Sequence, residues 1–199
     1  MADRQNEGLT IVSGLPRSGT SMMMRMIDAG GVPALIDNIR EADEDNPRGY
    51  YEFEPVKKTK QDPSWLESAG GKVVKMVHLL LLDLPTDRDY RVVFMKRDLD
   101  EVVRSQDIML DRSGKGGGGL SGDRIKQIFE TQLGKVGAYL EQHGNFRVLY
   151  VNYNQAIADP SGTVRDVNEF LGGRLDTQAM RQVVEPALYR QREGSPNAD

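Results

Sequence analysis

The stretch that decides the fold of this chain is Gly14-Leu15-Pro16-Arg17-Ser18-Gly19-Thr20-Ser21. It follows a short apolar run at residues 9–12 and precedes a methionine-rich segment that predicts a helix over 20–29. A strand, a turn bounded by glycines and a helix together direct backbone N–H groups and the positive end of a helix dipole at a phosphate. The stretch therefore predicts a phosphate-binding loop.

This loop differs from the Walker A loop of ATP-binding proteins after its second glycine. A Walker A loop continues with Lys and then Ser or Thr, whereas this chain continues with Thr20 and Ser21. The lysine that would reach a β- or γ-phosphate is missing, and the nearest cation, Arg17, lies inside the loop. We therefore expect a phosphate-like group of a nucleotide to bind here, without the arrangement that serves ATP and Mg²⁺.

The composition is that of an ordinary soluble globular protein. The 199 residues are 38% hydrophobic and 28% charged, with a formal net charge of −4, which argues against a general nucleic-acid binder. The absence of cysteine removes disulfides, thiolate zinc sites and a cysteine nucleophile. The N-terminus has no apolar signal-peptide core, and the longest apolar run, at residues 79–82, is too short to cross a bilayer.

From these features we expect a cytoplasmic protein that binds neither membranes nor nucleic acid. Its length predicts one domain, over residues 8–190, with flexible ends at 1–7 and 191–199. The oligomeric state is left open by the sequence.

Short apolar runs rich in β-branched residues alternate with helical segments along the rest of the chain. This alternation predicts an α/β fold, a three-layer sandwich with a mostly parallel sheet. The polar segment 37–64 predicts an irregular loop, and two interpretations of residues 41–54 stay open: a solvated acidic loop, or a segment that faces the substrate. Strands are expected at 72–77, 91–96 and 146–153, and helices from Asp98 onward and at 123–142, 160–171 and 177–188.

A second phosphate site is expected where the 91–96 strand ends. Arg97 follows this strand at its carboxyl end, where α/β folds place ligands. Asp98 and Glu101 have the spacing of a capping box, and Ser105 lies two turns along the predicted helix on the face of Asp98. Arg97 and Ser105 would then converge on one phosphate. An arginine beside a capping aspartate is also a common structural pattern.

Taken together, these motifs resemble those of the P-loop sulfotransferase family, and the chain looks like a small bacterial member. The loop at 14–21 is similar to the one that binds the 5′-phosphosulfate of 3′-phosphoadenosine 5′-phosphosulfate (PAPS), and Arg97 and Ser105 match the pair that binds its 3′-phosphate. The resemblance covers most of residues 8–172. It implies that the nucleotide is held by Pro16, Arg17, Ser18, Gly19, Thr20, Ser21, Arg97, Ser105 and Tyr153, the last matching an aromatic that contacts the adenine in related cytosolic enzymes.

The activity implied is transfer of a sulfuryl group from PAPS to a hydroxyl or amine of a small-molecule acceptor, without a metal. The product nucleotide would be adenosine 3′,5′-bisphosphate, and Arg17 would stabilise the charge that develops in the reaction. The catalytic base is left open. His78, at a strand end, is one candidate, although it could also be a merely structural histidine: cytosolic members carry Lys-Thr-His after the strand, and this chain has one residue more before His78. Other branches use a glutamate, for which Glu52 and Glu54 are candidates.

Two departures from the family leave alternatives. The Arg-Lys-Gly segment that closes over the 3′-phosphate in the cytosolic enzymes has no counterpart here, and Arg190 and Arg192 are candidates to replace it. One alternative function is therefore a module that binds the nucleotide without catalysis. The other is a P-loop kinase or nucleotide hydrolase, which the missing Walker lysine disfavours. The sequence does not identify the acceptor.

Overall fold

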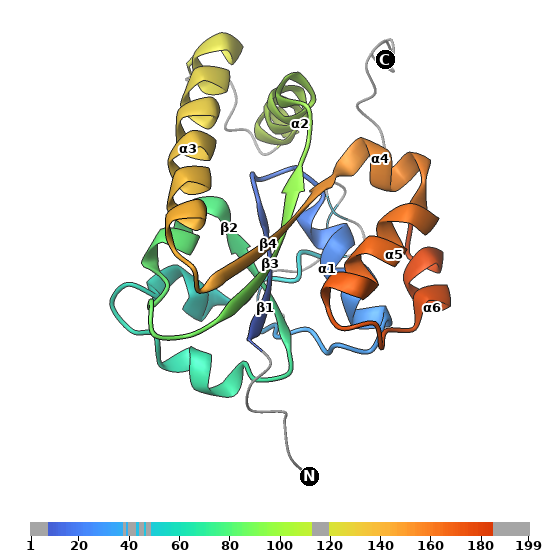
Figure 1. Ribbon diagram of the computed structural model, residues 1–199. Helices are drawn as coiled ribbons and strands as arrows, with labels where there is room; N and C mark the ends of the chain where they lie inside the picture. Colours follow the sequence, from blue (N-terminus) through green and yellow to red (C-terminus); the bar gives the residue numbers. More distant parts are fainter. Residues whose placement is uncertain are drawn as a thin grey trace.

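Four strands form one parallel sheet within the part of the chain that the computed structural model describes, residues 8–37, 39, 43, 46, 49–112 and 120–184. Their order is β2-β1-β3-β4, so the strand that leads into the phosphate loop is central (Figure 1). The all-parallel sheet confirms the predicted fold class. The strands are β1 (Leu9–Gly14), β2 (Val73–Val77), β3 (Tyr90–Lys96) and β4 (Phe146–Asn152).

Successive residues of the central strands are buried on opposite faces of the sheet. Ile11 of β1 pairs with Val74 of β2 and with Val92 of β3, and these residues belong to the core on one face. The next residue, Val12, pairs with Val93, and both belong to the core on the other face. Strands that are apolar on both faces are typical of a parallel sheet covered by helices on both sides.

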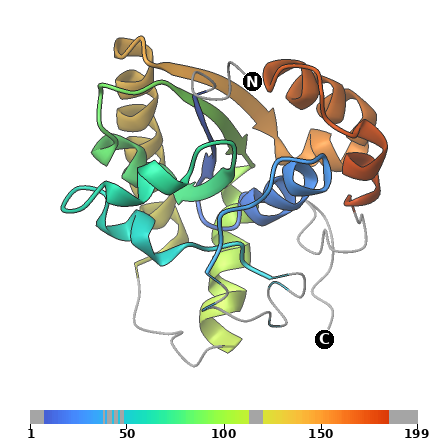
Figure 2. The same cartoon turned by 90° about the horizontal axis from the view of Figure 1, so that it is seen from below.

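Helices and 3₁₀ turns cover the two faces and complete the three layers (Figure 2). On one face, the methionines at 23, 24 and 26 of α1 are fully buried in the core. That face is covered by α1 (Thr20–Ala29), α4 (Tyr153–Ala158), α5 (Pro160–Phe170) and α6 (Thr177–Gln182). The other is covered by α3 (Gly122–Gln142), η1 (Glu54–Lys58), η2 (Ser64–Ser68) and η3 (His78–Asp83).

Helix α2 (Leu99–Arg112) begins just beyond the carboxyl end of β3 and lies against the phosphate loop. Leu15 of the loop is buried in a small cluster with Val102 and Val103 of α2 and Phe129 of α3. This packing fixes the first turns of α2 next to the loop, because a buried leucine must fit its neighbours closely.

The structure corrects several details expected from the sequence. Strand β4 ends at Asn152, and Tyr153 begins the short helix α4, which was not expected. Asp98 caps α2 by accepting the backbone N–H of Glu101 at 3.0 Å, but the Glu101 carboxylate bonds elsewhere and does not complete a capping box. Helix α6 ends at Gln182, before the expected end. The ends at 1–7 and 191–199, Arg190 and Arg192 lie outside the described residues.

Candidate functional site

A cavity of about 450 Å³ lies at the carboxyl ends of the strands, where a ligand was expected. Four of its lining residues directly end or follow strands: Gly14, Val77, Arg97 and Tyr153. The phosphate loop and the first turn of α1 line one part of the cavity, and the segment 46–57 lines another.

The phosphate loop is held in shape by its own hydrogen bonds. The Ser18 hydroxyl is buried and donates to the Leu15 carbonyl at 2.7 Å, so it stabilises the turn and does not line the cavity. Pro16, Gly19, Thr20 and Ser21 do line it. Because α1 starts at Thr20, its first backbone N–H groups and its positive dipole end lie at the cavity.

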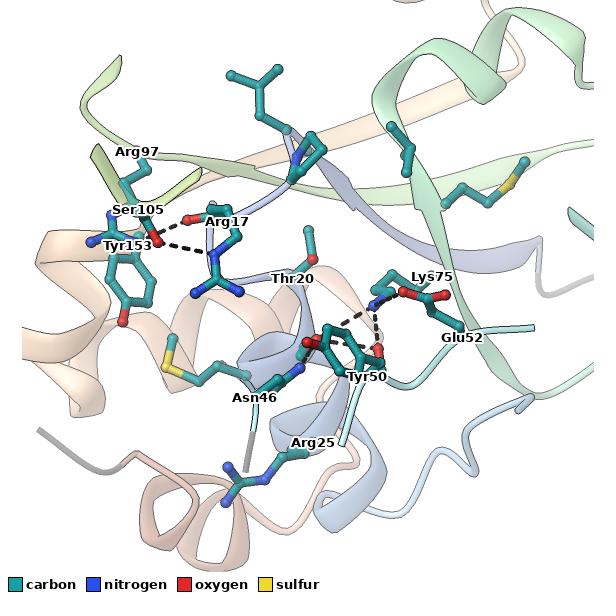
Figure 3. Close-up of a pocket in the computed structure, with 18 of the residues that line it drawn as sticks. Arg17, Thr20, Arg25, Asn46, Tyr50, Glu52, Lys75, Arg97, Ser105 and Tyr153 are labelled. Carbon is teal, nitrogen blue, oxygen red and sulfur yellow. Dashed lines mark hydrogen bonds and ion pairs between the residues drawn. The ribbon is translucent and has the colours of Figure 1, made fainter. Parts of the chain in front are cut away.

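Arg17, Arg97 and Ser105 come from three elements and meet at one side of the cavity (Figure 3). Arg17 has a left-handed backbone, with φ 68°, and its Nε donates to the Ser105 hydroxyl at 2.9 Å. Arg97 Nη1 donates to the Arg17 carbonyl at 2.9 Å. The structure therefore brings together the residues that the sequence placed in two separate motifs.

Tyr153 completes this side of the cavity. Its ring centroid lies 4.6 Å from the Arg97 guanidinium carbon, a distance typical of a cation–π contact. Burial raises the pKa of the Tyr153 hydroxyl, an effect that the nearby Arg97 charge opposes. The phenol is therefore neutral at pH 7.

A second group of polar residues, which the sequence did not indicate as a cluster, surrounds Lys75 on the other side of Thr20 (Figure 3). Lys75 Nζ contacts the Tyr50 carbonyl, lies 3.4 Å from the Ser21 hydroxyl and lies 3.8 Å from Glu52 Oε1. Asn46 Nδ2 also donates to the Ser21 hydroxyl, at 3.0 Å. Part of the segment 41–54 therefore faces the cavity, as one of the two interpretations predicted.

Glu52 lies between two lysines. One carboxylate oxygen is 3.8 Å from Lys75 Nζ and the other is 4.0 Å from Lys57 Nζ. The alternative candidate, Glu54, has a side chain that is 43% exposed, pairs with Lys57 and does not line the cavity. Of the two glutamates, the structure places only Glu52 at the cavity.

His78, the other candidate base, is buried outside the lining of the cavity. Its side chain is 2% exposed, does not line the cavity and bonds through Nε2 to Gln132 Oε1 of α3 at 3.0 Å. Burial lowers its pKa, so the imidazole is held neutral. His78 follows the end of β2 as the first residue of η3, and its side chain packs against α3, whereas Lys75, Met76 and Val77 of β2 line the cavity.

Lys75 and Asn46 are functional candidates that the sequence analysis missed. A single lysine inside the otherwise apolar strand β2 is a signal that could have indicated Lys75. Asn46 carries no such signal, because it lies in an irregular polar segment whose path depends on tertiary contacts.

The cavity is electropositive. Its described lining contains Arg17, Arg25, Lys57, Lys75 and Arg97 against the single carboxylate of Glu52. No group of three or more His, Asp or Glu residues suited to a metal ion occurs within the ranges that the structure describes. In those same ranges, no helix is long and apolar enough to cross a membrane.

Gly19 must be a glycine for two reasons, and this gives a first prediction. Its φ of +91° strains any L side chain, and a Cβ atom here would lie 2.3 Å from the Tyr153 ring. Gly31 has a similar φ, +105°, with no atom within 4 Å of the same position. We expect Gly31→Ala to cost about 1–3 kcal/mol of stability through backbone strain alone, and Gly19→Ala to cost more. Urea unfolding measures both; equal losses would contradict the contact with Tyr153.

No family model and no curated protein sequence matches the chain. Solved structures do match. The sulfotransferase domain of the Synechococcus PCC 7002 olefin synthase superposes with a TM-score of 0.58 at 13% identity, over 96% of this chain and 89% of that domain. The chain has the sulfotransferase fold.

Other sulfotransferases share this fold at similarly low identity. STF1 from Mycobacterium tuberculosis H37Rv is 18% identical with a TM-score of 0.56, over 89% of this chain and 70% of STF1. Mouse SULT7A1, solved in complex with PAP, is 15% identical with a TM-score of 0.58, over 89% of this chain and 63% of the mouse protein. At these identities the sulfotransferase fold is what the comparison establishes.

Proposed function

We propose that the protein is a PAPS-dependent sulfotransferase that transfers a sulfuryl group to a hydroxyl or amine of a small-molecule acceptor. The observation that carries the proposal is the convergence of Arg17, Arg97 and Ser105 on one cavity, beside a phosphate loop that lacks the Walker lysine. PAPS carries anionic groups at two positions, and a cavity lined by five cationic side chains and one carboxylate within the described residues suits such a ligand.

Different residues of the cavity suit the 5′-phosphosulfate and the 3′-phosphoadenosine part of PAPS. The loop and the first turn of α1 suit the 5′-phosphosulfate, because backbone N–H groups at a helix N-terminus bind anions. Arg97 and Ser105 suit the 3′-phosphate, and the Tyr153 ring, which lines the same cavity, suits the adenine. In SULT7A1 and in retinol dehydratase, proteins of the same fold, PAP is the bound nucleotide.

The acceptor is proposed to be an alcohol or amine on a largely apolar body. Phe53, Val56, Val77 and Leu80 line the cavity in the segments that also carry Glu52 and Lys75. Val77 is 43% exposed, which is unusual for a valine at the end of a buried strand and leaves its surface available for contact. An apolar body would contact these side chains while its hydroxyl or amine approaches Glu52.

The chemistry assigns a separate task to each charged residue. When bound, the donor supplies the sulfuryl group, whose bond to the 5′-phosphate oxygen breaks as the bond to the acceptor forms. Glu52 accepts the proton that the acceptor loses. Arg17 and Lys75 donate hydrogen bonds to the oxygens on which charge develops, and their positions are fixed beforehand by contacts with Ser105 and Ser21. Arg17 acts by charge alone, because a guanidinium keeps its proton in proteins.

Thermal unfolding with nucleotides tests the proposal. In about 100-fold excess over its dissociation constant, a ligand of the native state adds about 2.7 kcal/mol of stability, which is a rise of about 5–10 °C in a protein of this size. We expect this rise with adenosine 3′,5′-bisphosphate in EDTA and a much smaller one with Mg²⁺-ATP. The opposite order would favour a P-loop kinase. Binding of the bisphosphate with no turnover of PAPS, across a screen of alkyl and aryl alcohols and amines, would favour the non-catalytic module.

A further inference from the structure

Glu101 is a buried carboxylate directly behind the predicted 3′-phosphate site, and no step of the proposed reaction uses it. It lies in the first turn of α2, is 2% exposed and does not line the cavity. Its Oε2 accepts a hydrogen bond from Arg97 Nε at 2.8 Å, and its Oε1 accepts one from Asn154 Nδ2 of α4 at 3.1 Å. The carboxylate therefore links β3, α2 and α4 at the edge of the nucleotide site.

Arg97 passes this constraint on to the phosphate loop. Its Nε bonds Glu101 and its Nη1 bonds the Arg17 carbonyl, and its side chain is only 6% exposed. Two bonds from different atoms of one planar guanidinium fix the plane and the direction of the whole group. The bond from Arg97 thereby fixes the Arg17 carbonyl at the residue whose backbone has the left-handed φ of 68°. The side chain of the same residue makes the contact with Ser105.

A buried ion pair of this kind is a poor source of stability by itself. Removing two charges from water costs about as much as their attraction returns, so the net contribution of such pairs is small. What the pair does supply is orientation, since the Arg97 guanidinium has a charged partner on the side away from the cavity.

We propose that Glu101 is a positioning residue of the nucleotide site, which orients Arg97 for the donor's 3′-phosphate and, through Arg97, holds Arg17 for the transferred group. This inference rests on the proposed function, because it assumes a nucleotide with a 3′-phosphate. It assigns a binding role to a side chain that touches neither the nucleotide nor the acceptor.

The proposal predicts that Glu101→Gln changes the affinity for the nucleotide in the direction opposite to the one expected from charge alone. Glu101→Gln removes a negative charge close to an anion site, so electrostatics alone would tighten the binding of a phosphate. If Glu101 orients Arg97, the same substitution weakens binding, because a neutral amide holds the guanidinium less firmly than a carboxylate does. The direction of the change therefore separates the two effects.

The test compares two nucleotides in the full chain by calorimetry, adenosine 3′,5′-bisphosphate and adenosine 5′-monophosphate. Because the two nucleotides differ only in the 3′-phosphate, the ratio of their affinities measures the contribution of that phosphate to binding. We expect Glu101→Gln to lower this ratio by about tenfold, the change for one lost bond to a charged group. Asp100→Asn is the matched control: it removes the same charge from the neighbouring residue, whose exposed carboxylate bonds Lys126 instead. We expect it to leave the ratio unchanged or slightly raised.

A double-mutant comparison tests whether Glu101 acts through Arg97. In an Arg97→Lys background, which lacks the two-point contact, Glu101→Gln should lower the ratio no further, because residues that act as one unit are not additive. A ratio in Glu101→Gln that equals or exceeds that of the unchanged protein would overturn the inference, as would a full tenfold loss in the Arg97→Lys background.

Two further outcomes keep the test decisive. If Glu101→Gln does not fold, Asn154→Ala removes the other contact of the same carboxylate, and it should lower the ratio in the same direction by a smaller factor; an unchanged ratio would overturn the inference. If the unchanged protein does not prefer the bisphosphate, the proposed function fails together with the inference. A clear preference that survives Glu101→Gln overturns the inference alone.

Discussion

Arg17→Ala should reduce sulfuryl transfer at least about a thousandfold while the protein stays folded. Loss of one hydrogen-bond donor to a developing oxyanion costs about 10²- to 10³-fold in kcat, and here a full positive charge is lost as well. Arg17 lies in the turn of the phosphate loop and bonds Ser105 from one side of the cavity, so its guanidinium has a fixed position before any ligand binds. Release of adenosine 3′,5′-bisphosphate from PAPS, with an acceptor identified in the alcohol and amine screen, measures the effect.

Arg17→Lys is the graded control for this variant. It keeps the charge but loses the Nε–H that bonds Ser105, so an activity between those of the unchanged protein and Arg17→Ala is expected. Thermal unfolding without ligand checks that each variant is folded. A folded Arg17→Ala protein with ordinary turnover would show that this arginine has no part in the reaction.

Glu52→Gln should lower kcat by about 10²- to 10⁴-fold, the usual contribution of a general base. The amide keeps the size of the side chain but cannot accept a proton at neutral pH. Binding of adenosine 3′,5′-bisphosphate should be little changed, because Glu52 lies with Lys75 on the other side of Thr20 from Arg97 and Ser105. Steady-state kinetics and calorimetry on the same variant separate the two effects.

Glu54→Gln is the matched control for Glu52. The two glutamates lie two residues apart and both approach Lys57, yet Glu54 is exposed and does not line the cavity. We expect Glu54→Gln to keep nearly full activity. Equal activity of the two variants would mean that Glu52 is not the base, and His78→Gln would then be the next variant to assay.

The parts of the site that could be predicted from the sequence are those whose spacing is local. The phosphate loop lies between a strand and a helix in eight consecutive residues, and Arg97 and Ser105 lie at a strand end and two turns into the helix that follows. Each of these placements depends on one element and its cap. In the structure, Arg97, Ser105 and the residues of the loop other than Ser18 line one cavity.

The parts that could not be predicted depend on register and on contacts between distant segments. His78 lies one residue beyond β2, at the start of η3, where its side chain packs against α3 while its neighbour Val77 lines the cavity. Glu101 has the spacing of a capping box, but its carboxylate bonds Arg97 and Asn154 because tertiary contacts outweigh the local pattern. Asn46 and Lys75 meet at Ser21 although they lie 25 and 54 residues from it in the sequence, so no local pattern indicates the contact.

The hydrogen bond between Arg17 and Ser105 has a consequence for the driving force of nucleotide binding. The bond joins the Arg17 Nε–H to the Ser105 oxygen, so it fixes both side chains before the nucleotide binds and can persist while other N–H groups of Arg17 and the Ser105 O–H donate to the ligand. Little ordering of these side chains has to accompany binding, and much of the favourable energy comes from the attraction between an anionic ligand and the positive lining of the cavity. Such attraction is screened by dissolved ions, so affinity for the nucleotide should fall as ionic strength rises.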